Sequence, residues 1–155
     1  MRCSTYNPKL LEINNYIIEN YHKSSFNVDK LHYLTNISYS YTRTLIKDEY
    51  NCSPQRLLEI IRVGVAIRLL SENIEIRVLH ERIGYACSRT MRDAFHRRIN
   101  NSPKVCQLFL LHSKNKIDAI NQFYHSICKN GNVFVLLQII VNQKVMYGDT
   151  VEIVR

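Results

Sequence analysis

Glycine and proline are scarce in this 155-residue chain, which has four glycines and three prolines. The glycine-rich loops that hold phosphates in many nucleotide-binding enzymes are therefore absent. The chain also lacks the H-E-x-x-H pattern of zinc proteases and the G-x-S-x-G pattern of serine hydrolases. These absences argue against an enzyme, and we expect no catalytic residue, no bound metal and no cofactor.

Paired cysteines are missing too, because the five cysteines lie far apart and no C-x-x-C spacing occurs. An odd number of scattered cysteines is typical of reduced thiols in a cytoplasm rather than of a disulfide framework or a zinc site. These residues are Cys3, Cys52, Cys87, Cys106 and Cys128.

Apolar runs are short. The longest strongly apolar run covers residues 133–141, whereas a membrane-spanning helix needs about 20 residues. The N-terminal residues carry no apolar stretch after their positive charge, which excludes a secretory signal. We therefore expect a protein of the cytoplasm that has no membrane partner.

Positive charge is abundant and unevenly distributed. The net charge is +8, and residues 56–104 contribute +5 of it, with ten basic and five acidic side chains. Residues 28–49, by contrast, balance three basic against three acidic side chains. Because the positive charge is concentrated in one region, we favour a surface that binds a polyanionic partner over basic side chains that are only solvated.

The chain contains an internal repeat. The pattern N-x-S-P occurs at residues 51–54 and 100–103, and Leu-His occurs at 31–32 and 79–80. Asn36 pairs with Gly84 at the same spacing of 48 residues as the Leu-His pair. Each unit contains two short amphipathic stretches around a turn residue, followed by the N-x-S-P marker that opens a third stretch.

The residues of the repeat predict helix ends and corners. Ser53 and Ser102 are good N-caps, and the proline after each serine suits the first position of a helix. Asn36 and Gly84 tolerate the left-handed conformation that a tight corner between two helices requires. Two short helices around such a corner form the helix-turn-helix pattern.

The apolar spacing predicts a mainly α-helical fold. The expected helices cover residues 9–22, 28–35, 39–49, 54–72, 75–83, 87–98 and 103–112, and residues 117–128 are a candidate for one more. The helix over 54–72 is long enough to separate two units, which we place at residues 9–50 and 75–112.

An ordered set of residues resembles the DNA-binding domain of the AraC/XylS family of bacterial transcription regulators. The resemblance covers residues 11–109, about two thirds of the chain. It is carried by Ser53-Pro54, Arg62, Ala66, Leu69, Leu70, Ile83-Gly84-Tyr85, Phe95 and Ser102-Pro103. It implies one domain over 9–112, in which two helix-turn-helix units each place a recognition helix in one of two successive major grooves of double-stranded DNA. The implied function is a sequence-specific regulator at the bacterial nucleoid, an activator that has RNA polymerase as a candidate partner.

The chain departs from the family pattern at several positions. They are Asn36 for glycine, Thr42 for leucine, Ile46 for phenylalanine, His32 and His80 for alanine, and Cys106-Gln107 for an aromatic-arginine pair. An imidazole at these positions must point outward or force the two helices to shift, and we expect both histidines to be satisfied packing residues rather than ligands. We also expect no effector domain ahead of the first unit. The departures leave a second function open: a module that docks on another regulator or on RNA polymerase without binding DNA.

Helical periodicity separates inward from outward residues in the two recognition helices. The expected inward residues are Thr42, Leu45 and Ile46 in the first and Met91, Ala94 and Phe95 in the second. The expected base-reading residues are Ser40, Arg43, Thr44, Ser88, Arg89, Arg92, Asp93 and His96. Arg43 and Arg89 are the strongest candidates because arginine can pair with two acceptors of guanine. The expected phosphate contacts are Lys47, Thr90, Arg97 and Arg98.

Residues 113–155 differ from the rest in composition, and we expect them to be an extension that is dispensable for DNA binding and serves as a packing cap or as a partner surface. Asn130-Gly131-Asn132 indicates a turn, residues 133–137 favour a β-strand, and Gly148-Asp149 suggests a hairpin between 144–147 and 150–154. The apolar run needs a cover. The alternatives are the helices over 9–22 and 103–112, a second copy of the chain paired through strand edges, or a loosely ordered extension.

Overall fold

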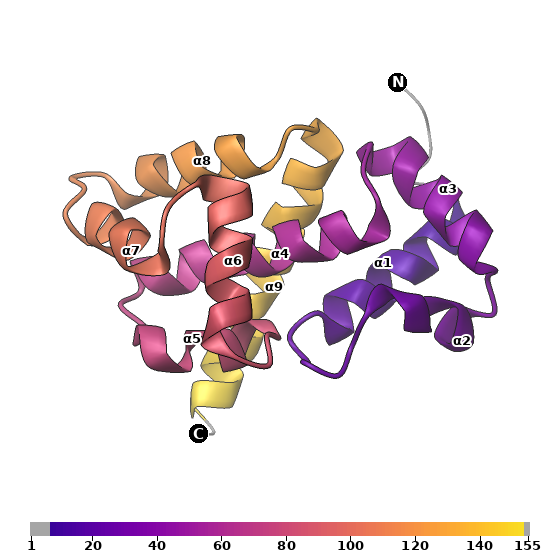
Figure 1. Cartoon of the computed structure of the whole chain (residues 1–155), viewed down its shortest axis with the longest axis horizontal. Coiled ribbons are helices and arrows are strands. Elements are labelled where there is room, and N and C mark those ends of the chain that lie inside the picture. Colours follow the sequence, from indigo (N-terminus) through magenta and orange to yellow (C-terminus); the bar gives the residue numbers. More distant parts are fainter. Residues whose placement is uncertain (1–6, 154–155) are drawn as a thin grey trace.

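The computed structural model describes the backbone of residues 7–153 and the side chains of residues 7–143. The described part is helical throughout and contains no strand, which confirms the mainly α fold (Figure 1). Its elements are α1 (Pro8–Asn20), the 3₁₀-helix η2 (Val28–Lys30), α2 (Leu31–Thr35), α3 (Tyr39–Tyr50), α4 (Pro54–Ser71), α5 (Ile76–Ile83), α6 (Ser88–Ile99), α7 (Pro103–Leu111), α8 (Lys116–Ile127) and α9 (Gly131–Ile153). The expected helices are confirmed to within two residues at each end, except that the second is split into η2 and α2.

The N-x-S-P markers end one helix and begin the next. Asn51 and Asn100 close α3 and α6 in the left-handed conformation, with φ angles of 57° and 63°. The Ser53 hydroxyl then accepts a hydrogen bond from the Arg56 amide at 3.2 Å, and Ser102 caps α7 in the same way. The repeat therefore marks the end of each recognition helix and the cap of the helix after it.

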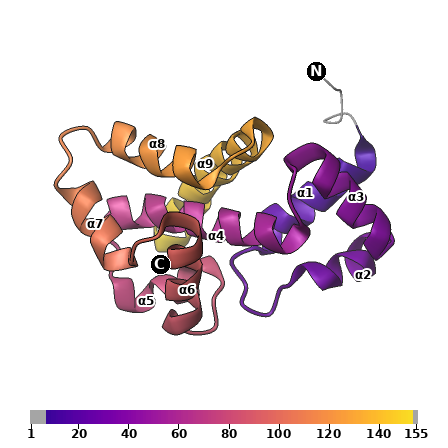
Figure 2. The ribbon, with the colours of Figure 1, turned by 45° about the horizontal axis from the view of Figure 1, so that its top comes forward.

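Helix α4 is the central element of the molecule (Figures 1 and 2). Helices α1 to α3 lie at its N-terminal end, and α5 to α7 lie around its C-terminal half. Fourteen of its eighteen residues are buried, so apolar side chains cover every face of the helix. A helix that is buried all round connects the two units rigidly, because bending it would expose core side chains on whichever side opens.

The β expectation for the C-terminal extension is wrong. Residues 133–137 belong to α9, and residues 144–153, which include most of the expected hairpin, are helical as well. Asn130 does not lead into a strand; its side chain caps α9 by accepting hydrogen bonds from the amides of Asn132 and Val133. The strand-edge pairing expected for a dimer therefore has no strand to use in the described residues.

The extension packs onto the rest of the chain through Gly64 of α4. The Tyr124 hydroxyl of α8 donates to the Gly64 carbonyl at 3.0 Å, and a β-carbon at Gly64 would lie 2.6 Å from the Leu137 side chain of α9. Both Tyr124 and Leu137 are at most 1% exposed. The apolar run is thus covered mainly by α4, rather than by α1 and α7, and the packing alternative is the one that the structure favours.

Within residues 7–153, no helix combines the length and the apolar character that crossing a membrane requires. Residues 7–143, whose side chains the structure describes, contain no group of three histidine, cysteine, aspartate or glutamate side chains that could hold a metal ion.

Candidate nucleic-acid interface

The first helix-turn-helix unit consists of α2 and α3 around a corner at Asn36. Asn36 has a φ of 58°, and its amide donates to the His32 carbonyl at 3.0 Å, which closes α2. The Thr35 hydroxyl accepts from the Ile37 amide, and the Ser38 hydroxyl caps α3 by accepting from the Tyr41 amide. Short polar side chains therefore satisfy the backbone donors of the corner.

The second unit consists of α5 and α6 around Gly84. Its φ of 95° is one that side-chain-bearing residues rarely adopt. A β-carbon at Gly84 would also lie 2.3 Å from the Tyr21 carbonyl oxygen, at the end of α1 in the other unit. Glycine is required here both by the corner and by the close approach of the first unit.

Arg62 of α4 ties the two units together. Its Nε donates to the Tyr21 carbonyl at 2.8 Å, and its Nη2 donates to the carbonyls of Lys23 and Phe26 at 3.2 Å. The guanidinium also lies over the ring of Tyr85, next to the second corner, 5.2 Å from the ring centroid. The sequence identified Arg62 as part of the family pattern but did not show this role. The sequence feature that could have pointed to this role is an arginine among the apolar residues of α4.

The inward faces of the recognition helices are as predicted. Thr42, Leu45 and Ile46 of α3 are buried, and so are Met91, Ala94 and Phe95 of α6. The predicted outward residues are exposed, except for Ser88 and Arg98, which are partly buried. The structure therefore brings the expected residues onto one face of each recognition helix.

The outward face of α3 is organised by local contacts. The guanidinium of Arg43 lies over the ring of Tyr39, 5.7 Å from its centroid. The Thr44 hydroxyl donates to the Ser40 carbonyl at 3.1 Å, and Lys47 is exposed one turn further along. Arg43 is thus supported by an aromatic ring on its own helix, which limits its freedom before any partner binds.

The outward face of α6 carries more polar groups. Arg92 donates to the Ser88 hydroxyl at 3.1 Å, and the Thr90 hydroxyl is hydrogen-bonded to the Cys87 thiol at 3.3 Å. That hydrogen bond lowers the pKa of the Cys87 thiol. Arg89, Asp93 and His96 are exposed beside them.

The last two predicted phosphate contacts are held by a carboxylate of α4. Arg97 approaches Glu59 at 2.7 Å and Arg98 approaches it at 2.8 Å. The side chain of Arg97 is 54% exposed, whereas that of Arg98 is 18% exposed. Arg97 is therefore open to an external partner, while Arg98 is mainly held inside the molecule.

The two histidines before the corners behave differently. His32 is only partly buried, with its Nδ1 2.9 Å from the Asp29 carbonyl and its ring beside Tyr33, in agreement with an outward packing residue. His80 is also partly buried, but its Nδ1 is enclosed and has no hydrogen-bond partner among residues 7–143. The second unit thus accommodates its imidazole less completely than the first.

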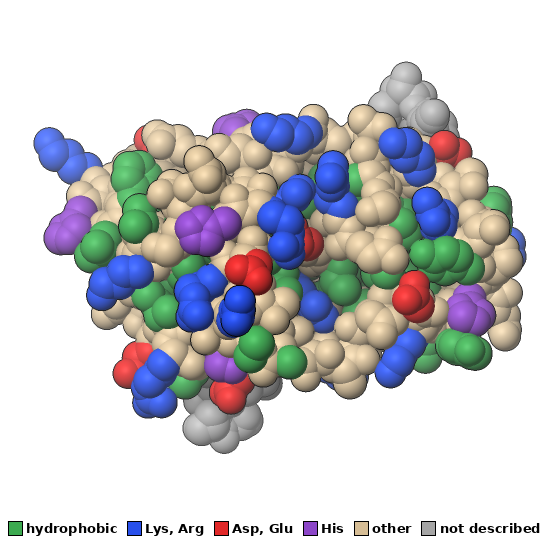
Figure 3. All heavy atoms as spheres, viewed as in Figure 1, with side chains coloured by type: hydrophobic (Ala, Val, Ile, Leu, Met, Phe, Trp, Pro, Cys, Tyr) green, Lys and Arg blue, Asp and Glu red, His purple; other side chains and the backbone are tan. Residues whose placement is uncertain are grey.

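Basic side chains gather on the face that presents α6. Figure 3 shows Lys and Arg side chains over α6 and across the middle of this face, with few acidic ones among them. A surface of this kind attracts the phosphates of nucleic acids.

Two corner-linked helix pairs joined by a long buried helix define a tandem helix-turn-helix protein. Residues 34–107 match a family model described as "Helix-turn-helix domain". This match agrees with the resemblance to the AraC/XylS DNA-binding domain found in the sequence.

Among curated proteins, the chain is similar to the raffinose operon transcriptional regulatory protein RafR of Pediococcus pentosaceus. The two are 39% identical over 89 residues, which are 57% of this chain and 32% of that relative. The matched part thus spans about a third of the relative's length. No solved structure matches the chain.

Proposed function

We propose that the chain regulates transcription by binding double-stranded DNA in a sequence-specific manner, with α3 and α6 in two successive major grooves. The observation that carries this proposal is the placement of two recognition helices, each with an exposed polar face, on one rigid helix. Helix α4 has eighteen residues and is therefore about 27 Å long. Major grooves on one side of DNA repeat every 34 Å or so, a separation that helices near the two ends of α4 can approach.

In this proposal arginine side chains read bases on both recognition helices. Arg43 on α3 and Arg89 on α6 are exposed and reach guanine edges, since arginine can donate to O6 and N7 together. Asp93 accepts from a cytosine amino group or orients Arg89 across one helical turn. The remaining base-reading residues are Ser40, Thr44, Ser88, Arg92 and His96.

Phosphate contacts fix the position of the protein on the duplex. Lys47, Thr90 and Arg97 are exposed at the edges of the recognition faces and suit this role. Arg98 contributes only if it leaves its ion pair with Glu59.

The regulatory outcome that the family resemblance favours is activation, with RNA polymerase as the protein partner, at the nucleoid. The similarity to a protein named as an operon regulator supports control of transcription without deciding its direction. Transcription in vitro from a bound promoter, with and without the protein, measures the direction. More transcript supports activation, and less transcript contradicts it.

A second function is favoured by the surface of the first unit. Tyr33, Leu34 and Tyr41 are 76%, 42% and 41% exposed on α2 and α3, which is more apolar surface than a DNA-binding face needs. In this alternative the chain docks on another regulator or on RNA polymerase and binds DNA weakly or not at all.

Selection from a random duplex library, followed by affinity measurements at several salt concentrations, separates the two functions. The DNA-binding proposal predicts an enriched motif in two parts spaced by about one helical turn, and an affinity that falls steeply with salt. A library that remains unenriched at low salt favours the docking function. A motif that covers only one groove contradicts the two-groove arrangement.

A further inference from the structure

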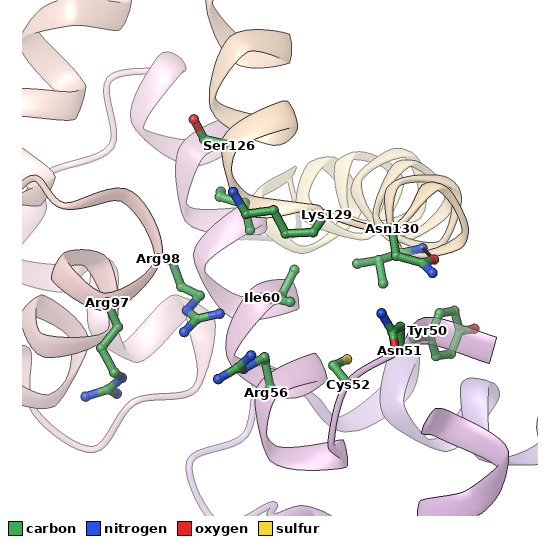
Figure 4. A pocket seen from close by; sticks show the side chains of 12 residues that line it. Tyr50, Asn51, Cys52, Arg56, Ile60, Arg97, Arg98, Ser126, Lys129 and Asn130 are labelled. Carbon is green, nitrogen blue, oxygen red and sulfur yellow. Dashed lines mark hydrogen bonds between the residues drawn. The ribbon is translucent and has the colours of Figure 1, made fainter. Parts of the chain in front are cut away.

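A cleft of about 450 Å³ opens between the two units and the C-terminal extension (Figure 4). Its lining comes from the end of α3 and the start of α4, from the end of α6, and from the turn between α8 and α9. Its size falls within the range of small-molecule sites in proteins. None of the predicted base-reading residues lines it, whereas two of the predicted phosphate contacts, Arg97 and Arg98, do, so the cleft lies beside the proposed DNA-binding surface.

The charge of the cleft is strongly positive. Its lining includes four cationic side chains and no acidic one; the cations are Arg56, Arg97, Arg98 and Lys129. Glu59, which is not part of the lining, forms ion pairs with both Arg97 and Arg98. Its single negative charge neutralises one of the two positive charges of these arginines. Arg56 and Lys129 are exposed and add two further charges.

Three of the four cations converge on one space. In Figure 4, the guanidinium groups of Arg56 and Arg98 extend toward each other, and the side chain of Lys129 crosses above them from the α8–α9 turn. Arg97 points away from this space. Like charges that face each other repel, and the repulsion is stronger where the walls exclude water. An anion between them would turn this repulsion into attraction.

The wall of the cleft is partly apolar and includes a buried thiol on which the cations act. Ile60, Ile127 and Val133 are apolar and buried, and Cys52 is a further buried residue of the lining. Burial raises the pKa of the Cys52 thiol, while Arg56, Lys47 and Arg98 act in the opposite direction. Arg56 and Arg98 thus project a positive potential onto a buried group of the cleft.

We propose that this cleft binds a small molecule that carries phosphate groups. Arg56, Arg98 and Lys129 would bind the phosphate oxygens, because charge-assisted hydrogen bonds from arginine and lysine are the strongest available to an anion. Asn51 and Ser126 add polar groups to the lining, and the apolar wall suits the body of the molecule. A DNA duplex is too wide to enter the cleft and reaches only exposed side chains at its rim.

The position of the cleft gives such a ligand a regulatory effect. Its lining joins the first unit, the second unit and the extension, so a bound molecule would stabilise the arrangement of α3 and α6 that the structure shows. This consequence rests on the proposed function, whereas binding itself does not and can be measured without DNA.

Titration calorimetry of the full chain with inorganic pyrophosphate, and then with ATP as a larger probe, tests the proposal. The variants are Arg56→Gln and Lys129→Gln, which remove cations of the cleft from exposed positions. Lys104→Gln is the matched control, because Lys104 is an exposed cation on α7 outside the cleft. Circular dichroism verifies that all three variants are folded.

We expect saturable binding of pyrophosphate by the wild-type chain, weakened about tenfold or more by each cleft variant and about unchanged by the control. Equal weakening by all three variants would show diffuse attraction to a basic protein and overturn the proposal. An absence of binding by either probe would also overturn it. If, in addition, the cleft variants weakened binding to duplex DNA, the cleft would be a contact for the DNA backbone instead.

Discussion

The two helix-turn-helix units share a geometry but differ in chemistry. Both corners are left-handed, at Asn36 in the first unit and at Gly84 in the second. The first unit has no net charge over residues 28–49 and exposes aromatic side chains, whereas the second, over residues 75–112, carries seven basic against three acidic side chains. The corner and the caps are therefore enough to form a helix-turn-helix unit, while the residues on its exposed face can change independently.

The largest expected effect on the free energy of unfolding comes from a substitution at the corner of the second unit. Gly84→Ala should lower the free energy of unfolding by about 3–5 kcal/mol, because the new β-carbon meets the Tyr21 carbonyl and the positive φ is strained. Asn36→Gly should change it by less than about 1 kcal/mol, since asparagine already tolerates this conformation. Urea denaturation measures both, and similar values would contradict the difference between the corners.

The extension provides the next largest effect. Leu137→Ala should cost about 3 kcal/mol, because it leaves a cavity against Gly64 in the core beside α4. Val135→Ala is the matched control on the same helix, since Val135 is 56% exposed, and it should cost less than about 1 kcal/mol. If both substitutions were neutral in thermal denaturation, the extension would be dispensable for folding.

On DNA, the two units should contribute unequally. We predict that Arg89→Ala weakens specific binding by about tenfold to a hundredfold and relaxes the preference at one base pair. Arg43→Ala should weaken it less, because the first unit has no excess of basic residues to support it. Fluorescence anisotropy on a selected site measures both variants. A larger loss for Arg43→Ala, with both variants folded, would reverse the assignment.

The smallest expected effect lies in the core of the first unit. The Thr42 hydroxyl is buried and has no hydrogen-bond partner in the part of the chain that the structure describes. Thr42→Val should therefore raise the free energy of unfolding by about 0.5–1 kcal/mol, since it removes an unsatisfied polar group without changing the shape. A loss of stability in urea denaturation would show that the hydroxyl has a partner after all.

Most of the fold could be predicted because its signals are local. Serine caps, prolines at the first helical position and left-handed asparagines act within a few residues of the helix ends that they mark. The outward faces of α3 and α6 followed from helical periodicity for the same reason.

The failure at α9 is instructive because the helical signal was present. The buried residues of the run are Val133, Leu136, Leu137, Ile140 and Val141, which follow helical spacing. The β-branched composition outweighed this spacing in the prediction, although packing against α4 overrides such preferences. The hydrogen-bond partners of Glu59 and Arg62 could not be predicted, because they are 36 to 41 residues away in the sequence.

The hydrogen bonds of Arg62 determine which side chains of the loop after α1 can be substituted without loss of the link. All three of its hydrogen-bond acceptors are main-chain carbonyls, of Tyr21, Lys23 and Phe26. Carbonyl oxygens do not titrate, so protons cannot weaken this link as they would weaken one made to a carboxylate. Every residue type also supplies the same carbonyl. The loop after α1 can therefore exchange exposed side chains such as Lys23 through mutation without loosening the joint between the two units.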